Sequence, residues 1–328
     1  MRVLVTGGAG FLGSHLCDAL IARGDEVVCV DDLSSGLIDN VAGLLDHRGF
    51  RFVRADVSAE PELPGRFDAI AHLASAASPP EYQRLALETL RVGSRGSEFV
   101  LDMAARDGAR VVLASTSEIY GEPLVHPQPE TYWGNVNSIG PRSMYDEAKR
   151  FAEALFSAHL RSLGTNTGIV RIFNTYGPRL RPLDGRVVSN FIHQAISGDP
   201  ITVYGDGHQT RSFCFVDDLV AGLVAMIDSD AAGPVNLGNP VETSVIELAQ
   251  KIIEFTGSTS EVVFLPRPVD DPTVRRPDIT RAGELLGWAP SVSLETGLDV
   301  TINWQQHQRS VQSVIDIRSR GAEGVKVS

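Results

Sequence analysis

Short apolar runs alternate with amphipathic stretches through the first half of the chain. Apolar runs that end in glycine or in small polar residues predict buried parallel strands at 2–6, 26–31, 50–57, 67–74, 109–116 and 166–174. Apolar residues at helical spacing predict helices over 14–24, 84–106 and 143–163. This alternation predicts an α/β fold in which helices cover both faces of a parallel sheet.

The pattern changes after residue 174. Turn-rich pieces such as "TYGPRLRPLDGR" alternate there with short helical stretches, which predicts a smaller and less regular lobe. The length of 328 residues also favours two lobes. We expect a first domain over 1–173 with a return segment near 211–235, and a second, substrate-binding α+β lobe from 174–210 and 236–310. Residues 311–328 lose apolar periodicity, so we expect them to form a flexible tail.

Composition restricts the partners of the protein. The formal net charge is -12, and an acidic surface repels nucleic acid and anionic membranes. No apolar run approaches the ~20 residues that cross a bilayer, and the first residues enter a strand without a signal-peptide pattern. The three cysteines, Cys17, Cys29 and Cys214, form no C-x-x-C pair, which favours a reducing compartment. We therefore expect a cytoplasmic protein without a nucleic-acid, membrane or metal partner.

A glycine-rich turn follows the first predicted strand. Gly7, Gly10 and Gly13 form G-x-x-G-x-x-G where the strand passes into a helix, which is typical of a turn that places a pyrophosphate on the helix N-terminus. The next strand ends at Asp31, where a carboxylate accepts hydrogen bonds from ribose hydroxyls and repels a 2′-phosphate. The following "DLSSG" offers no arginine for such a phosphate, so the pattern predicts NAD rather than NADP.

The full set of expected cofactor-binding residues follows the ends of the predicted strands, with two residues from a later helix. They are Gly7, Gly10, Phe11, Leu12, Gly13, Asp31, Asp32, Ser35, Gly36, Asp56, Val57, Leu73, Ala74, Ser75, Tyr145 and Lys149.

Candidate catalytic residues lie in two stretches. The strand at 109–116 ends in "ASTSEIYG", which places Thr116, Ser117 and Glu118 at the edge of the sheet. The helix at 143–163 carries Tyr145 and Lys149, which share one helix face at i, i+4 spacing. A nearby ammonium lowers the pKa of a phenol from about 10. Such a tyrosine can take a proton from a sugar hydroxyl while nicotinamide takes the hydride.

These motifs, together with "RIFNTYGP" at 171–178, resemble the extended short-chain dehydrogenase/reductase superfamily. The resemblance implies a Rossmann-type doubly wound domain, a smaller substrate lobe, tightly held NAD and a homodimer. Longer strings are similar to the UDP-glucuronate decarboxylases, also called UDP-xylose synthases. These strings lie at 75–83, 125–150, 184–213, 234–240 and 270–279.

The resemblance implies a three-step cycle. Tyr145, supported by Lys149 and Thr116, deprotonates the C4 hydroxyl of UDP-glucuronate while C4 passes its hydride to NAD. The resulting ketone lies β to the C6 carboxylate, which leaves as carbon dioxide while donors stabilise the enolate. Return of the hydride gives UDP-xylose, with possible partial release of a UDP-4-keto-pentose. Glu118 is expected to hold the sugar or a relay water, and Arg275 to contact the carboxylate or deliver a proton.

The expected substrate contacts come mainly from the second lobe. Asn174 suits phosphate or sugar oxygens, and the Arg211 guanidinium suits a diphosphate. The complete set is Pro79, Tyr82, Arg142, Asn174, Arg179, Val188, Asn190, Tyr204, Gln209, Arg211 and Arg275.

Three other functions compete with this interpretation. A uronate or hexose 4-epimerase would return the hydride to the other face without losing carbon. A 4,6-dehydratase needs an Asp-Glu pair after the threonine, where this chain has Ser117 and Glu118. A non-catalytic NAD-binding regulator typically lacks the Tyr or the Lys, and this chain keeps both. We interpret Ser117 as the residue that permits loss of carbon dioxide instead of water.

The chain also departs from the family pattern. Gly93 stands where the family commonly has asparagine, and Ala76 and Ser138 stand where proline is usual. These positions lie near the expected substrate and cofactor loops. Of the three steps, the final transfer of hydride from NADH back to C4 is the one that we expect them to affect.

Overall fold

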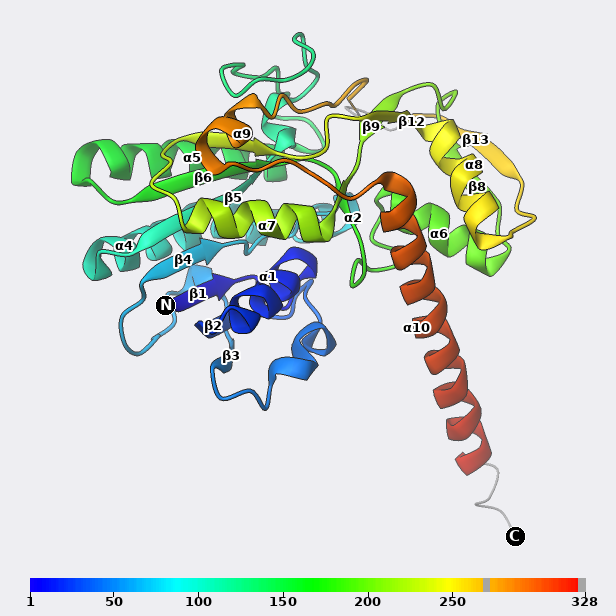
Figure 1. Cartoon of the computed structure of the whole chain (residues 1–328), viewed down its shortest axis with the longest axis horizontal. Helices are drawn as coiled ribbons and strands as arrows, with labels where there is room; N and C mark the ends of the chain where they lie inside the picture. The colour runs from blue at the N-terminus through cyan, green and yellow to red at the C-terminus, as the bar shows by residue number, and fades with distance from the viewer. Residues whose placement is uncertain (268–271, 324–328) are drawn as a thin grey trace.

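A seven-stranded sheet forms the centre of the first domain (Figure 1). The structure is a computed structural model that describes residues 1–267 and 272–323, with the backbone alone for 311–323. The sheet order is β11, β6, β5, β4, β1, β2, β3, and every neighbouring pair is parallel. The strands are β1 (Arg2–Thr6), β2 (Glu26–Asp31), β3 (Phe50–Arg54), β4 (Ala69–His72), β5 (Arg110–Thr116), β6 (Thr167–Ile172) and β11 (Pro234–Leu237).

The predicted α/β fold is confirmed, and the sheet order explains where a ligand can bind. The chain moves outward from β1 through β2 to β3 and then returns to β4 on the other side of β1. Open parallel sheets bind ligands at such a reversal, in the crevice outside the carboxyl ends of the strands. The glycine turn that follows β1 lies at this point.

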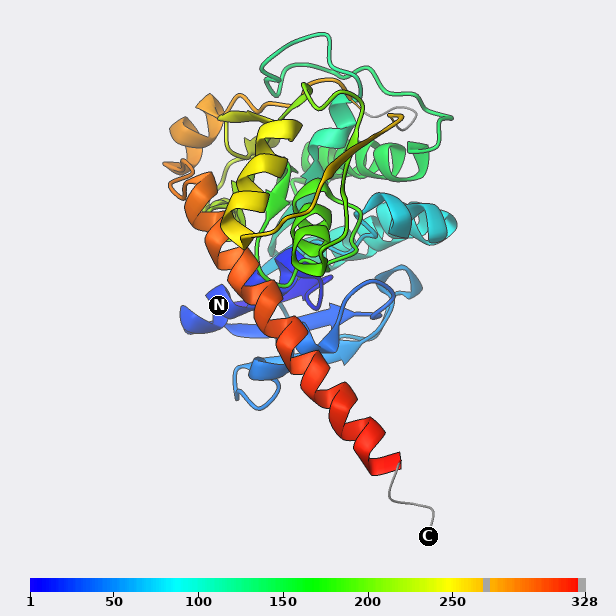
Figure 2. The same ribbon diagram turned by 90° about the vertical axis from the view of Figure 1, so that its right-hand side faces the viewer.

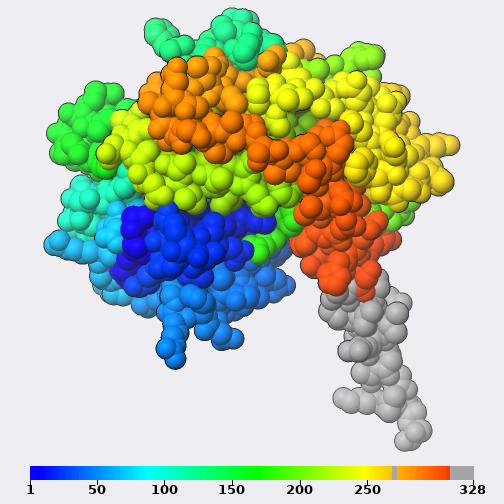
Figure 3. Space-filling view, in the orientation of Figure 1, coloured from blue at the N-terminus to red at the C-terminus, as the bar shows by residue number. Residues whose placement is uncertain are grey.

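Helices cover both faces of the sheet. On one face, α1 (Phe11–Ala22) packs against α7 (Val216–Ile227), and Figure 3 shows their surfaces in contact. The other face carries a run of helices, of which α4 and α5 pack directly on β4, β5 and β6. The members of this run are α3 (Ala86–Arg91), the π-helical turn η3 (Val92–Gly96), α4 (Ser97–Asp107) and α5 (Ser143–Leu163).

The second lobe is built from short elements. Its small sheets pair β7 (Thr175–Tyr176) with β10 (Cys214–Phe215), β8 (Ile201–Tyr204) with β13 (Val262–Leu265), and β9 (Thr210–Ser212) with β12 (Glu242–Ser244). Its shorter helices are α6 (Val187–Ser197), α8 (Val245–Thr256) and α9 (Thr280–Leu286). The first part of the chain contributes a further short helix, α2 (Pro79–Arg84), and the 3₁₀ turns η1 (Ile38–Leu44), η2 (Val57–Ala59) and η4 (Ser117–Tyr120).

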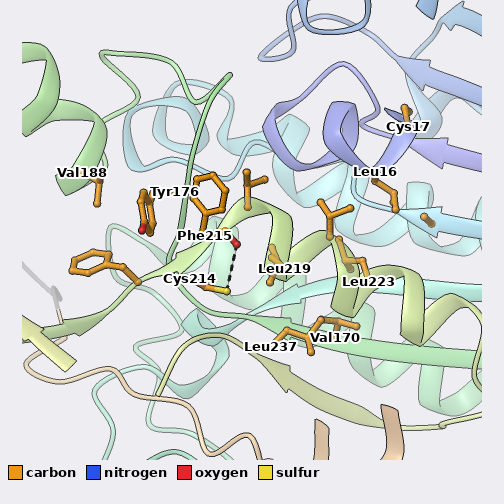
Figure 4. Packing of buried hydrophobic residues seen from close by; sticks show 14 of the residues in the cluster. Leu16, Cys17, Val170, Tyr176, Val188, Cys214, Phe215, Leu219, Leu223 and Leu237 are labelled. Atoms are coloured by element: carbon orange, nitrogen blue, oxygen red, sulfur yellow. Dashed lines mark hydrogen bonds between the residues drawn. The ribbon is translucent and has the colours of Figure 1, made fainter. Parts of the chain in front are cut away.

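One hydrophobic core joins the two lobes. Figure 4 shows Leu16 and Val170 of the first domain in the same cluster as Val188 of α6 and Phe215 of β10. All are at most 4% exposed. Because this core is continuous, the second lobe is held against the sheet over a broad apolar contact.

The last helix, α10 (Leu294–Glu323), extends beyond the expected end of the second lobe. Leu298 and Ile302 anchor its first turns in the core, and Figure 2 shows its later turns leaving the body of the protein. Residues 311–323, which we expected to be part of a tail, therefore continue a helix. A helix that is anchored at its start can propagate without apolar periodicity, because each further residue adds one backbone hydrogen bond once the helix is nucleated. Residues 324–328 lie outside the described part of the chain.

Candidate active site

A cavity of about 820 Å³ lies between the carboxyl ends of the strands and the second lobe. Every residue that we expected to bind cofactor or substrate, or to act in catalysis, lines this cavity. They come from segments between Gly7 and Arg275, and they converge because the ends of parallel strands meet at one edge of the sheet. Two residues of the string at 270–279 that supported the family resemblance, Asp270 and Asp271, lie outside the described part of the chain.

The glycine turn is shaped for a close approach of the backbone to a ligand. Gly7 has φ +71°, a conformation that side chains disfavour. A Cβ at Gly13 would lie 2.1 Å from the carbonyl oxygen of Gly7, so only glycine fits there. Helix α1 begins directly after Gly10, and its first residues line the end of the cavity where a pyrophosphate would bind.

Asp31 closes the same end of the cavity. Its carboxylate accepts hydrogen bonds from the backbone N–H groups of Ala9 at 3.0 Å and Leu33 at 2.8 Å. Burial raises its pKa, and these two hydrogen bonds oppose the rise. A carboxylate accepts about four hydrogen bonds in all, so Asp31 retains capacity for ribose hydroxyls. The glycine turn and this acid together fit a dinucleotide.

Tyr145 and Lys149 face the end of β5. The Lys149 ammonium donates a hydrogen bond to the carbonyl of Ala114 at 2.8 Å and lies 5.9 Å from the centre of the Tyr145 ring. Burial lowers the pKa of Lys149 to about 8. Burial also raises the pKa of Tyr145 to about 12, although a hydrogen bond with Thr116 opposes this rise. The sequence-based prediction of a lowered phenol pKa is therefore wrong for this structure, because burial outweighs the neighbouring charges.

Tyr82 stacks on Tyr145. The rings of Tyr82 and Tyr145 are 5.2 Å apart and nearly parallel, at 7°. Among the described residues, the buried Tyr82 hydroxyl has no hydrogen-bond partner. Tyr82 belongs to the cavity wall. Burying a hydroxyl without a partner is costly, so the arrangement fits a polar ligand atom at this place.

A charged cluster lies beside Tyr145. Glu118 forms ion pairs with Arg142, at 2.6 Å, and with Arg275. Burial alone would raise the pKa of Glu118, but the two guanidinium groups lower it to about 2. Arg275 also donates hydrogen bonds to the Ser117 hydroxyl at 3.4 Å and to the carbonyl of Gly121 at 3.3 Å. The two guanidinium groups thus favour the ionised form of Glu118, which pairs with both.

The segment that carries Arg275 is clamped through its main chain. Arg211 donates to the carbonyls of Pro272 at 2.6 Å and Thr273 at 3.1 Å. The amide of Gln128 and its backbone bind the main chain of Arg276 from the other side, at 2.8 and 2.9 Å. Arg211, which we expected to bind a diphosphate, thus holds this segment through its guanidinium, a structural role that the sequence did not indicate.

Two arginines of the cavity wall were missed by the sequence analysis. Arg186 donates to the carbonyl of Ala77 at 2.9 Å, and its charge lowers the pKa of Tyr145 against the effect of burial. Arg181 lies 3.9 Å from Glu81. Both belong to the turn-rich piece after β7, whose several arginines were the available signal.

Gly93, a departure from the family pattern, lies where two helices touch. A Cβ at this position would be 2.7 Å from the Cβ of Ala148 and 2.9 Å from its carbonyl oxygen. Ala148 precedes Lys149 on α5. The glycine and the π-helical turn around it therefore let α5 lie close to η3, and a side chain here would displace the helix that carries Tyr145.

Comparison with known proteins establishes the class. The chain belongs to the NAD dependent epimerase/dehydratase family, which it matches over residues 3–238. Within that family it is 50% identical over 317 residues to UDP-glucuronic acid decarboxylase 1 of Xenopus tropicalis. The match covers 95% of this chain and 75% of that protein.

Solved structures of the same family share the whole fold. The dTDP-glucose 4,6-dehydratase DesIV of Streptomyces venezuelae, with NAD and TYD bound, superposes with a TM-score of 0.85 and 29% identity. This comparison covers 94% of our chain and 98% of DesIV. UDP-glucuronic acid 4-epimerase of Bacillus cereus, in complex with NAD, gives a TM-score of 0.83 at 26% identity, over 94% of our chain and 99% of the epimerase. The cofactor of the present protein is NAD.

Proposed function

We propose that the protein is a UDP-glucuronate decarboxylase that forms UDP-xylose. The observation that carries this proposal is the cluster of Ser117, Glu118, Arg142 and Arg275 beside Tyr145, in a chain half identical to a protein of that name. Two guanidinium groups and the Glu118 carboxylate leave a net positive charge, and burial raises the pKa of the nearby Asp146 carboxyl to about 7, which favours its neutral form. Such a charge suits the carboxylate of a uronate sugar.

The first step is oxidation at C4 of the sugar. Bound NAD supplies the hydride acceptor. Tyr145 in its deprotonated form takes the proton of the C4 hydroxyl, and Thr116 holds the same oxygen through its hydroxyl. Lys149, fixed on the carbonyl of Ala114, keeps a positive charge near the phenol and favours its deprotonated form.

The second step is loss of carbon dioxide. The C4 ketone lies β to the C6 carboxylate, so cleavage of the C5–C6 bond leaves its electron pair delocalised onto O4. The hydroxyls of Thr116 and Tyr145 stabilise that oxygen. Because Glu118 stays ionised at neutral pH, it is not the acid that protonates C5. The proton that C5 gains comes from a water molecule beside Ser117 and Arg275, which these two groups polarise while Glu118 holds the arginine in place. The hydride taken from C4 then returns to C4 and Tyr145 returns its proton to O4, which gives UDP-xylose.

Product analysis tests the proposal. Purified protein is incubated with UDP-glucuronate and NAD, and the sugar nucleotide is analysed by mass spectrometry while released carbon dioxide is collected. We expect a product lighter by one carbon dioxide, with no net formation of NADH. A product lighter by two further hydrogens, with accumulating NADH, would show that a 4-keto-pentose is released before the last reduction. UDP-galacturonate of unchanged mass would contradict the decarboxylase and identify an epimerase.

We also propose a homodimer, in which α3 and α5 of two copies pack together. Leu87 and Leu90 of α3 are 62% and 40% exposed, and Phe151 of α5 is 52% exposed. Helices α3 and α5 contact each other, and both carry exposed apolar side chains. A second copy would cover them, because an apolar patch of this kind is costly in water.

Acidic substitutions test this interface. In the double variant Leu87→Asp, Phe151→Asp we expect light scattering to give the mass of a single chain, because two charges would be buried in each half of the contact. Leu285→Asp, on the exposed side of α9, is the matched control and should leave the dimer intact. A dimeric double variant would place the interface elsewhere.

A cytoplasmic location is the last part of the proposal. Cys17, Cys29 and Cys214 are buried free thiols, as expected in a reducing compartment. Among the described helices, none has the length and apolar character to cross a membrane. Fractionation of cells that produce the protein should recover it with cytoplasmic markers, and recovery with secreted proteins would contradict this location.

A further inference from the structure

A buried ion pair lies behind the catalytic strand, outside the cavity wall. The Glu153 carboxylate of α5 binds the Arg171 guanidinium of β6 through two contacts, at 3.0 and 2.8 Å. Its Oε1 also accepts a hydrogen bond from the Ser115 hydroxyl at 2.6 Å. The side chains of Glu153 and Arg171 are only 13% and 9% exposed. A buried pair of this kind gives little net stability, so its presence calls for another explanation.

Three residues of α5 are tied to three successive residues of β5. Tyr145 is hydrogen-bonded to Thr116, Lys149 to the carbonyl of Ala114, and Glu153 to Ser115. On α5 these residues are four apart, so they share one helix face. Glu153 is therefore the third member of the row that begins with the catalytic tyrosine, and it lies one helical turn beyond Lys149.

We propose that Glu153 is a positioning residue for the reaction, which keeps Lys149 charged and fixed on the end of β5. Its carboxylate is the neighbouring negative charge that raises the Lys149 pKa, and Arg171 and Ser115 hold it in one orientation. This inference rests on the proposed function only in that Lys149 supports Tyr145 during the oxidation. The state of Lys149 itself does not depend on which sugar is the substrate.

The electrostatic surroundings of Lys149 agree with this role. Burial lowers its pKa to about 8, and the Glu153 charge is what opposes that change. From β4, His72 lies close enough to interact with Lys149, but burial lowers the His72 pKa to about 3, so this imidazole is neutral. From α5, Tyr145 is neutral as well. From β6, the charge of Arg171 is not among those that shift the Lys149 pKa. Without Glu153, Lys149 would lose its proton at a lower pH.

A titration of the lysine side chain tests the inference directly. The chain has three lysines, Lys149, Lys251 and Lys326, so protein labelled with [¹³Cε]lysine gives three signals that Lys149→Met assigns. The NAD-loaded full chain is titrated without substrate. In Glu153→Gln we expect the midpoint of the Lys149 signal to fall by about one pH unit, as for loss of one nearby carboxylate. The Lys251 signal is the internal control.

Enzyme kinetics provide the second measurement. Activity needs the Lys149 ammonium, so the decline of kcat/KM at alkaline pH should move to lower pH in Glu153→Gln by the same amount. Glu153→Asp, which keeps the charge, should leave the midpoint near that of the unchanged protein. A purely structural residue would instead lower activity equally at every pH.

Two outcomes would overturn the inference. The first is that the titration midpoint of the Lys149 signal is the same in Glu153→Gln as in the unchanged protein, whatever the activity of the variant. If that variant does not fold because Arg171 is left buried without its partner, Glu153→Gln, Arg171→Gln removes both charges. An unchanged midpoint in this double variant is the second. If decarboxylation is absent while the midpoint shifts, the proposed function fails and the role of Glu153 stands.

Discussion

Replacing Tyr145 with phenylalanine should abolish the first oxidation. The ring is retained, so its stacking on Tyr82 at 5.2 Å and its fit in the core survive, and only the hydroxyl that takes the substrate proton is lost. General-base catalysis contributes about 10² to 10⁴ in rate, and we expect kcat/KM to fall by roughly 10³ or more. The measurement is the appearance of NADH in a single turnover with UDP-glucuronate.

Tyr176→Phe is the matched control for this experiment. Tyr176 is also buried and donates a hydrogen bond to the carbonyl of Leu294 at 3.2 Å, away from the cavity wall. It should retain normal turnover. If Tyr145→Phe also oxidised the sugar at the normal rate, another residue would have to be the base.

Replacing Arg275 with methionine should separate the two halves of the reaction. The Tyr145, Lys149 and Thr116 contacts do not include Arg275, so oxidation at C4 should continue and NADH should appear. Release of carbon dioxide should fall by roughly 10² to 10³, the effect of removing one preorganised donor. Carbon dioxide and NADH are therefore measured in the same samples.

The neighbouring Arg276 supplies a control of the same type. Its side chain is 39% exposed and pairs with Glu242 at 3.5 Å, whereas the Arg275 side chain is 4% exposed. Arg276→Met should leave both products unchanged. Melting temperatures of both variants identify any general loss of structure, since Arg275→Met leaves Glu118 with a single cationic partner. Equal rates of carbon dioxide release in Arg275→Met and the unchanged protein would exclude the assigned role.

The sequence predicted the sheet well, and the residues that it proposed for the site line one cavity. Strand β2 and helix α5 have the bounds that their apolar patterns indicated, Glu26–Asp31 and Ser143–Leu163. The spacing of apolar residues and the residues that end a strand are local properties of the sequence. They can therefore be recognised without knowing the fold. The site residues then come together because the topology of a parallel sheet fixes where its strands end.

Properties that depend on distant contacts were not predictable in this way. The direction of the Tyr145 pKa shift depends on burial under Tyr82 and the second lobe. The contacts of Arg211 with Pro272 and Thr273 join positions about 60 residues apart in the sequence. The ion pair of Glu153 with Arg171 involves a helix and a strand whose register only the folded sheet defines.

The clamp on the segment around Arg275 has an evolutionary consequence. Arg211 and Gln128 hold this segment by the carbonyl and amide groups of Pro272, Thr273 and Arg276, which any sequence would offer. These contacts fix the path of the backbone without using the side chain at position 275. Members of a family that share the residues for C4 oxidation can therefore convert the oxidised sugar to different products through few substitutions in this segment. Exchange of this short segment between relatives is a practical route to redirecting the product.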